Sequence, residues 1–431
     1  MNIGTKIILL SIHIFFIPLI FIVVLFSRLK SFLFVQNKIN IFLGTSPIIN
    51  FSNYSVIIKQ LGFFTKTFVT HCFIINKEED WDVIMTKRMR FIIRPIKYFL
   101  YFIYVLYKYD IFITTYRGLF IGSFPFGRFQ FNYLKYAGKK TIVIAYGSDS
   151  YVYRRISLPR ISHCLQTNYG PAAKLQNLIA KNLDHITQIA DAVIPSIMYA
   201  DGFGRWDILT PCPFFLDLNS WITSKRNNNA NGIDGEVVVA HSPNHRGVKG
   251  TEYLLEAIKI LKDEGLKVTL KLYEGVPNEE IKKDFANNVD ILVEQLNGYG
   301  YALSGLEGMA SGLPVISSDQ DNIYVEPFRI WSFFDECPIV GSSCLRLVKD
   351  LRHLIMHPNL RIELGKAGRA YAEKYHGYDS GEFFFSNLFD YINGKRESII
   401  NLYHPILGEY PNRSPKIKHP LVNNRIVEKS R

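Results

Sequence analysis

The feature that most constrains the fold is an alternation of short apolar runs and amphipathic segments in the second half of the chain. Apolar runs at residues 237–240, 268–273, 289–293 and 314–317 have the length of buried strands. Helical patterns lie between them, and Asn278 is placed to cap one of these helices. Alternating strands and helices predict a parallel, doubly wound sheet, whose ligands bind at the carboxyl ends of its strands.

The loop after the first of these strands is basic. Residues 237–251 read VVVAHSPNHRGVKGT, so a turn is followed by Arg246 and Lys249 and then by an amphipathic helix. Backbone N–H groups and the helix dipole favour anions at a helix start, and two cations aimed at one point suit a pyrophosphate. The competing interpretation is a surface loop with solvated cations. The EGVP loop and a Gly-rich loop at 297–300 also follow strands, so all three are expected to face one crevice.

The first half of the chain has a looser α/β pattern. Strands are predicted at residues 39–43, 68–74, 110–116, 141–145 and 192–195.

The domain boundary is predicted at a polar stretch. Residues 217–235 contain SKRNNNANGIDG, which is rich in Asn and Gly and has no periodicity, so this segment is the predicted linker. It separates a Rossmann-like domain at 31–216 from a second one at 236–395, and 431 residues suit two domains. The basic tail at 396–431 is expected to be poorly ordered beyond Tyr403.

Residues 7–26 are almost wholly apolar, and twenty such residues can span ~30 Å of hydrocarbon. A cleaved signal peptide is the competing interpretation, but no small-residue cleavage site follows the run. More Lys and Arg lie just after the run than before it, which places the main body in the cytoplasm. Residues 1–30 are therefore predicted to anchor the chain in the inner (cytoplasmic) membrane. His13 and Pro18 weaken a straight span, so an anchor lying in the membrane plane remains open.

A second apolar stretch at residues 94–109 reads RPIKYFLYFIYVLYKY and is too short for a second span. One interpretation is a buried helix of the N-terminal domain. The other is contact with the bilayer interface, because Tyr and Lys suit the headgroup region.

The net charge of +12 indicates an acidic partner. The basic residues are scattered and match no nucleic-acid-binding module, so nucleic acid is not expected and an anionic membrane or a phosphorylated substrate remains. The five cysteines are far apart and odd in number, which predicts buried thiols in a reducing compartment and no metal site.

Four segments of the second half carry a resemblance to a known family. The runs HSPNHRGVKGTEYLLEAI, YEGVPNEE, DILVEQL and YGYALSGLEGMASGLPVIS follow one another over about 80 residues. Together they resemble the nucleotide-binding half of GT-B glycosyltransferases, most closely the family 4 retaining enzymes of bacterial envelope polysaccharide synthesis. The resemblance implies two Rossmann-like domains and a nucleotide-diphosphate sugar as co-substrate, with no metal and no other cofactor.

The resemblance also implies roles for particular residues. Arg246 and Lys249 match the pair that neutralises the donor diphosphate, and such cations stabilise the leaving group most in the transition state. Glu307 matches the glutamate that accepts hydrogen bonds from the donor ribose. The remaining donor-binding residues implied are Glu274, Gly275, Val276, Gly300 and Tyr301.

The chain departs from the family pattern at Tyr299, where the first glutamate of the E-x7-E element would contact the sugar. The nearest upstream carboxylate is Glu294. Either the sugar-facing loop is remodelled or the sugar is recognised differently.

The N-terminal domain is expected to face the acceptor. The strand at 141–145 leads into Gly147 and Asp149, and Arg117 follows the strand at 110–116. An acceptor contact and a turn role are both open for Asp149.

These observations predict a membrane-anchored GT-B hexosyltransferase. It would move a sugar, with retention, to a lipid-linked or polysaccharide acceptor at the cytoplasmic face. One rival is a nucleotide-sugar epimerase on the same fold, which the membrane segment disfavours. The other is a non-catalytic scaffold of a polysaccharide synthesis complex, suggested by the missing glutamate.

Overall fold

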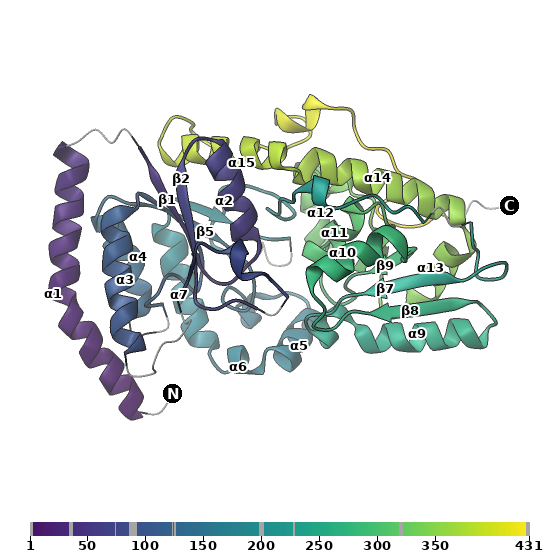
Figure 1. Ribbon diagram of the computed structural model, residues 1–431, viewed down its shortest axis with the longest axis horizontal. Coiled ribbons are helices and arrows are strands. Elements are labelled where there is room, and N and C mark those ends of the chain that lie inside the picture. Colours follow the sequence, from purple (N-terminus) through teal and green to yellow (C-terminus); the bar gives the residue numbers. More distant parts are fainter. Residues whose placement is uncertain are drawn as a thin grey trace.

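The fold was described from a computed structural model, which places residues 3–33, 38–73, 75–85, 93–122, 124, 126–197, 202–226, 229–318 and 322–427. It contains two parallel β-sheets, each covered by helices, and an apolar helix that precedes them (Figure 1). The predicted fold class, two Rossmann-like α/β domains with an N-terminal hydrophobic helix, is confirmed.

The N-terminal sheet has the strand order β3-β2-β1-β4-β5-β6, with every described pair parallel. This order reverses direction between β1 and β4, which is the point where doubly wound sheets bind ligands. The predicted strand at 68–74 is displaced, because β2 pairs with β1 over residues 64–69. The strands are β1 (Asn40–Thr45), β2 (Phe64–Val69), β3 (Val83–Ile84), β4 (Ile111–Thr115), β5 (Lys140–Ile144) and β6 (Ala192–Ile194).

The C-terminal sheet has the order β11-β10-β9-β7-β8, also parallel, and reverses between β7 and β9. All five residues of β7 are buried, as expected for a central strand covered on both faces. The strands are β7 (Val237–His241), β8 (Val268–Leu272), β9 (Ile291–Val293), β10 (Val315–Ser318) and β11 (Val340–Ser342).

Helices connect these strands and cover both sheets (Figure 1). In the first half they are α2 (Asn50–Gln60), α4 (Gln130–Tyr136), α5 (Pro159–Asn168), α6 (Gly170–Ala173) and α7 (Gln176–Ile189). In the second half they are α8 (Arg246–Lys249), α9 (Thr251–Asp263), α10 (Asn278–Asn287), α11 (Leu303–Ala310), α12 (Asn322–Trp331), α13 (Leu347–Met356), α14 (Pro358–His376) and α15 (Tyr378–Ile392).

The N-terminal helix α1 (Ile3–Leu33) lies along α3 (Arg94–Lys108) at the end of the molecule farthest from the C-terminal sheet (Figure 1). The Phe16 ring stacks on Phe99 with centroids 5.0 Å apart. Helix α1 is long and apolar enough to cross a membrane, a test that a core helix or a signal sequence also passes. The stretch at 94–109 is a helix with one buried face, as the first interpretation predicts.

The last long helix, α15, belongs to the second half of the chain but packs on the N-terminal domain. Phe385 packs edge-on against Tyr54 of α2 at 5.0 Å, and the Tyr391 hydroxyl donates to Asp207 at 2.8 Å. The two domains are therefore joined by this helix as well as by the linker.

The prediction of a poorly ordered tail is wrong for residues 404–427. The backbone N–H of Ile417 donates to Glu336 at 2.8 Å, and the Asn424 amide donates to the carbonyl of Cys337 at 2.7 Å. Tyr410 and Leu421 are buried. These apolar side chains are widely spaced and show no periodicity, so a pattern search does not find them.

Candidate active site

The reversal point of the C-terminal sheet contains a buried polar network. His241 ends β7 and is wholly buried, with Nδ1 bonded to the carbonyl of Val293 at 2.7 Å and Nε2 to the Thr251 hydroxyl at 2.9 Å. Burial lowers the pKa of His241 to about 4, so the ring is neutral at pH 7. His241 thereby ties the ends of β7 and β9 to the first turn of α9.

Lys249, one of the two predicted diphosphate ligands, points into this network. Its side chain is 7% exposed and forms an ion pair with Glu294, which is 0% exposed. The ammonium also donates to the Gln295 side chain at 3.4 Å. The charge that was predicted to meet a ligand is therefore neutralised inside the protein.

Glu294 holds several other groups besides Lys249. Its carboxylate accepts hydrogen bonds from the hydroxyls of Ser304 at 3.0 Å and Ser317 at 3.2 Å, and from the Ala302 N–H at 3.4 Å. Ala302 is the N-terminal cap of α11, so an internal anion occupies the positive end of that helix. Sequence reasoning assigned no role to Glu294. Its position directly after β9, at the carboxyl edge of the sheet, was the available signal.

Arg246 lies at the other end of α8 and points toward solvent. Its side chain is 41% exposed and donates to Glu252 at 2.8 Å and to both oxygens of Glu274 at 3.0 Å. These hydrogen bonds raise the pKa of Arg246. The expectation that Arg246 and Lys249 aim at one point is therefore wrong: each is directed at carboxylates of its own.

Glu307, the predicted ribose ligand, is buried on α11. The Asn278 amide donates to its Oε1 at 3.1 Å. Burial raises the pKa of Glu307 to about 7, partly offset by the Asn278 hydrogen bond. The Lys282 and Lys249 ammonium groups lower the same pKa, and the Glu294 carboxylate raises it.

Asn278 was predicted to cap α10, and this prediction is wrong. It is the first residue of α10, its neighbour Pro277 takes the cap position, and no side-chain cap bond forms. The Asn278 side chain instead reaches Glu307.

The Gly-rich motif turns into the core rather than toward a ligand. Tyr301 is buried, and its hydroxyl bonds to that of Tyr371 at 2.8 Å and to His376 Nε2 at 2.7 Å. Gly300 has φ of 55°, and an added Cβ would lie 2.8 Å from Ile197 of the N-terminal domain. The Tyr301 side chain is thus directed into the core, and the donor-binding role of this residue stays a prediction. Gly300 is required by backbone conformation and domain packing.

Tyr299 takes the position where the family has its first glutamate. It is wholly buried and stacks on Tyr324 with centroids 4.6 Å apart. The Arg160 guanidinium of α5 lies 5.8 Å from the same ring. This position therefore joins the two domains.

The three predicted donor-binding residues of the EGVP loop differ in exposure. Glu274 and Gly275 are exposed, and Val276 is half-buried against the core. Gly275 has φ of 68°, a conformation that favours glycine, and directs the chain from β8 toward α10. Of the three, only Glu274 has a side-chain contact with a predicted catalytic residue, Arg246.

On the N-terminal side, Asp149 accepts a hydrogen bond from the backbone N–H of Arg117 at 2.8 Å. Asp149 thus links the loops that follow β4 and β5, which is the structural role left open by the sequence. Burial raises its pKa, although the Arg117 N–H bond lowers it. Gly147 closes the turn before it, accepting from the Ser150 hydroxyl at 2.8 Å.

The carboxyl edges of the two sheets lie near each other. Asn168 of α5 accepts from the Gly247 N–H at 3.2 Å, and the Tyr169 ring lies 4.5 Å from that of His245. The N-terminal domain therefore contacts the basic loop directly.

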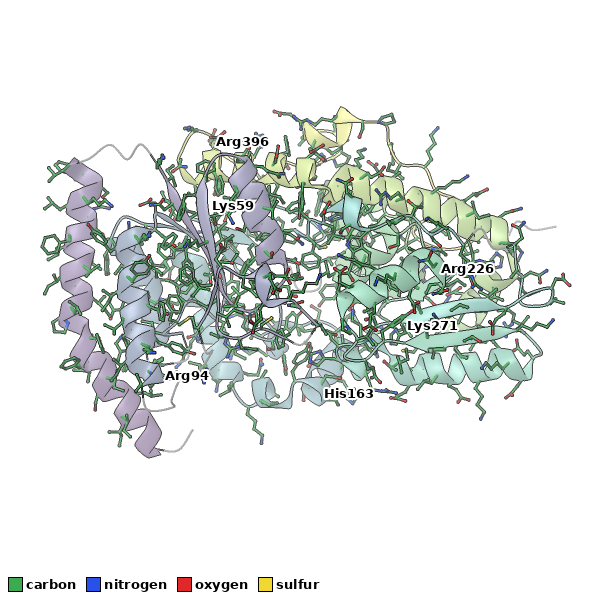
Figure 2. The ribbon with its side chains drawn as sticks, in the orientation of Figure 1. Lys59, Arg94, His163, Arg226, Lys271 and Arg396 are labelled. Atoms are coloured by element: carbon green, nitrogen blue, oxygen red, sulfur yellow. The ribbon has the colours of Figure 1, made fainter. Side chains whose placement is uncertain are left out.

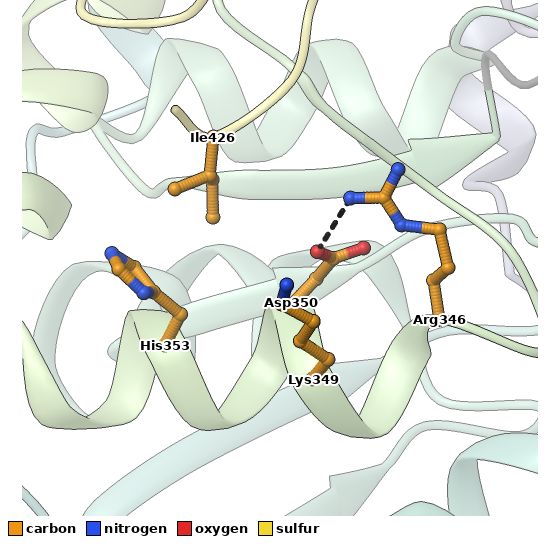
Figure 3. A pocket seen from close by; sticks show the side chains of 5 residues that line it. All are labelled: Arg346, Lys349, Asp350, His353 and Ile426. Carbon is orange, nitrogen blue, oxygen red and sulfur yellow. Dashed lines mark hydrogen bonds and ion pairs between the residues drawn. The ribbon is translucent and has the colours of Figure 1, made fainter. Parts of the chain in front are cut away.

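Two hollows lie elsewhere. One, of about 240 Å³, is lined by Arg346, Lys349, Asp350, His353 and Ile426, with Arg346 paired to Asp350 at 3.2 Å (Figure 3). The other, of about 1130 Å³, lies between α14 and residues 410–420. Neither includes a predicted site residue. Within the described residues, no three His, Cys, Asp or Glu side chains gather in a way that could hold a metal ion.

Comparison with known proteins gives similarity at the level of structure. No protein-family model matches the sequence, and no curated protein matches it. A glycosyltransferase from Rickettsia africae ESF-5 aligns over 84% of this chain and 100% of its own, at 12% identity and a TM-score of 0.49. S. aureus MnaA, in a structure with UDP, aligns over 83% and 97%, at 11% identity and 0.46.

A third similar structure is the Streptomyces sp. SF2575 glycosyltransferase SsfS6 complexed with thymidine diphosphate, which aligns over 81% of this chain and 99% of its own, at 11% identity and a TM-score of 0.37. At such values the similarity transfers no residue role and no activity.

Proposed function

We propose that this protein is a glycosyltransferase that takes its sugar from a nucleotide-diphosphate donor. The observation that carries the proposal is the placement of Arg246, Lys249 and Glu307. Arg246 and Lys249 follow β7 and Glu307 follows β9, so all three come after the carboxyl ends of the two strands at which the C-terminal sheet reverses. The motifs that carry the family resemblance supply these same residues.

In this proposal Arg246 is the diphosphate ligand. Its present partners, Glu252 and Glu274, are 69% and 44% exposed, so they can release the guanidinium to water at little cost. A guanidinium binds phosphate oxygens in a fork and stabilises the negative charge that develops as the glycosidic bond breaks.

Glu307 is the proposed ribose ligand. A carboxylate accepts hydrogen bonds from ribose hydroxyls, and the bound hydroxyls in turn favour its ionised form. Lys249 acts through Glu294, which fixes the start of the helix that carries Glu307. Lys249 is then a positioning residue rather than a ligand.

The acceptor is proposed to be a lipid-linked saccharide or polysaccharide at the cytoplasmic face of the membrane, entering on the side of Asp149 and Arg117. Retention, with the leaving phosphate deprotonating the acceptor, needs no protein base, and neither a metal nor a further cofactor is invoked.

A transfer assay tests the proposal. The full chain is incubated with a panel of nucleotide sugars and a membrane lipid extract, and glycosylated lipid is detected by mass spectrometry. Transfer of one sugar supports the proposal. Release of an epimerised free sugar, or no turnover of any donor, contradicts it.

A second function is favoured by two observations. Lys249 is neutralised inside the protein, and Tyr299 stands where the resemblance would place a glutamate. Both fit a non-catalytic scaffold that no longer binds nucleotide. Calorimetry with UDP, CDP, GDP and thymidine diphosphate separates the two functions, because the scaffold binds none of them.

A further inference from the structure

Helix α1 is attached to the N-terminal domain along most of its length. His13, Phe16, Ile20, Val24 and Ser27 are buried and recur at spacings of three and four residues, which places them on one helical stripe. This stripe faces α3 and α4. The helix is thus part of the domain core rather than an appendage.

The attachment extends over the region that a membrane span would need. Phe16 stacks on Phe99, Phe21 packs against Tyr133 at 5.9 Å, and the Ser27 hydroxyl donates to the carbonyl of Leu106 at 3.4 Å. Near the end of the helix, the Lys30 ammonium lies 5.1 Å from the Tyr107 ring.

These contacts oppose a free crossing of the bilayer. From His13 to Lys30 the attached part of the helix is about 27 Å long, and only ~15 Å remains before it, whereas a hydrocarbon core is ~30 Å thick. A perpendicular α1 would carry α3 and α4 into the hydrocarbon with it.

Among the residues that the structure describes, no helix or strand lies beyond α1 on the side away from α3 (Figures 1 and 2). Phe15, Leu25 and Phe32 are 77%, 68% and 86% exposed. Helix α3 adds exposed Leu100 and Tyr104 beside it. Side chains of this size are rarely left in water over such an area.

The charged residues within helices α1, α3 and α4 are all of one sign. Helices α1, α3 and α4 contain no Asp or Glu. Their cations include Arg94, labelled at the start of α3 in Figure 2, and Arg28, Lys30, Lys97, Lys108 and Lys135. Cations beside an apolar face complement an anionic bilayer, in which the side chains enter the hydrocarbon and the charges meet lipid phosphates.

We propose that α1 and α3 form a monotopic docking surface that lies in the plane of an anionic bilayer without crossing it. The inference specifies how the protein would be held at the membrane, and it rests on the proposed function. It predicts that both ends of α1 are on the same side of the membrane.

A flotation experiment tests the surface. The full chain is mixed with vesicles of phosphatidylcholine alone or with 30% phosphatidylglycerol, and the bound fraction is measured. Binding should require the anionic lipid. The triple change Phe15→Gln, Leu25→Gln, Phe32→Gln should lower partitioning at least about tenfold.

A matched control changes three equally exposed apolar residues of the C-terminal half, Leu345→Gln, Ile406→Gln and Leu407→Gln, and should bind vesicles as the parent does. Equal loss in both triple variants, or unchanged binding in the first, would overturn the inference. Nucleoside diphosphate binding, measured on the same preparations, reports failure of the proposed function separately.

A labelling experiment distinguishes an α1 helix that lies in the membrane plane from one that crosses the membrane. Gly4→Cys and Ser31→Cys are introduced one at a time near the two ends of α1, in a chain with Cys72→Ser and Cys344→Ser. A membrane-impermeant maleimide is applied to spheroplasts and to inside-out vesicles. Both cysteines should react from the same side. Reaction from opposite sides, loss of residue 4 by cleavage, or a chain that stays soluble would overturn the inference.

Discussion

The two ends of helix α8 carry the same charge in opposite environments. Lys249 is buried against a fully buried carboxylate, whereas Arg246 is half-exposed between two exposed carboxylates. A buried ion pair is costly to break because either partner alone remains as an uncompensated charge. An exposed pair exchanges partners at little cost. Of two cations that look equivalent in sequence, only one is available to a ligand.

The largest effect expected from this difference is on stability. Lys249→Met leaves Glu294 buried without its cation and should lower the free energy of unfolding by about 3–5 kcal/mol. Adding Glu294→Gln removes the stranded charge and should restore most of the loss. Urea denaturation followed by circular dichroism measures both.

The matched control is Lys395→Met, which removes a 74% exposed ammonium 3.8 Å from Asp390. It should cost less than about 1 kcal/mol. Equal costs for Lys249→Met and Lys395→Met would show that the buried ion pair of Lys249 contributes no more to stability than an exposed pair does.

Glu307 is also a buried carboxyl, but its hydrogen-bond donor, Asn278, is uncharged, whereas Glu294 is paired with a lysine. Its pKa of about 7 lies above its ordinary value of 4.5, so the folded protein binds this proton more tightly than the unfolded chain does. The favourable contribution of protonated Glu307 to folding is fully present below pH 4.5. It is lost as the pH rises to about 7, because ionising the buried carboxyl costs about 3 kcal/mol of folding free energy.

Glu307→Gln removes this dependence. The variant should match the parent at about pH 4 and be more stable by up to about 3 kcal/mol at about pH 8, as judged by denaturation at both values. A parent whose stability relative to the variant does not change with pH would mean that Glu307 stays ionised and solvated.

The fold was largely predictable because it depends on pattern. Short apolar runs alternating with helices place the strands of both sheets, and parallel pairing follows from the length of each connection. The exceptions are β3 and β11, for which no strand was predicted, and β2, for which residues 68–74 were predicted but pairing with β1 selects residues 64–69. Local hydrophobicity cannot reveal a register that is determined by a neighbouring strand.

The position of the candidate site along the sheet edge was predictable, but the directions of its side chains were not. Arg246 and Lys249 were placed at the carboxyl edge by the strand that they follow, and Glu307 was identified by its match to the family motif. Which way each side chain turns depends on partners 28 to 45 residues away, such as Glu274 for Arg246 and Glu294 for Lys249. No local pattern records those partners. Tyr301 shows the same limit, since its hydroxyl partners lie in α14.

Nucleoside diphosphate binding tests whether the exposed end of α8 is available to a ligand. Arg246→Ala should weaken nucleoside diphosphate binding about 10- to 100-fold, the usual effect of losing a forked contact to phosphate. The unfolding curve should not move, because the side chain is half-exposed. Calorimetry with the donor nucleotide measures the affinity.

Arg352→Ala is the control for that change, because Arg352 is also an arginine of the C-terminal domain paired through two nitrogens with one glutamate, Glu264. Its loss should leave affinity unchanged. An affinity that is insensitive to Arg246→Ala would remove Arg246 from the donor site.

The smallest expected effect comes from the partners of Arg246. Glu252→Gln removes one of the two carboxylates that compete with a diphosphate for the guanidinium, so affinity should rise about 2- to 5-fold at low salt. The gain should disappear at about 0.5 M salt, where interactions between exposed charges are screened within a few ångströms. Glu264→Gln, which frees Arg352 in the same way, should have no effect at either salt concentration. Weaker binding in Glu252→Gln would show instead that Glu252 holds Arg246 in its binding position, and the exposed end of α8 would then be as fixed as the buried one.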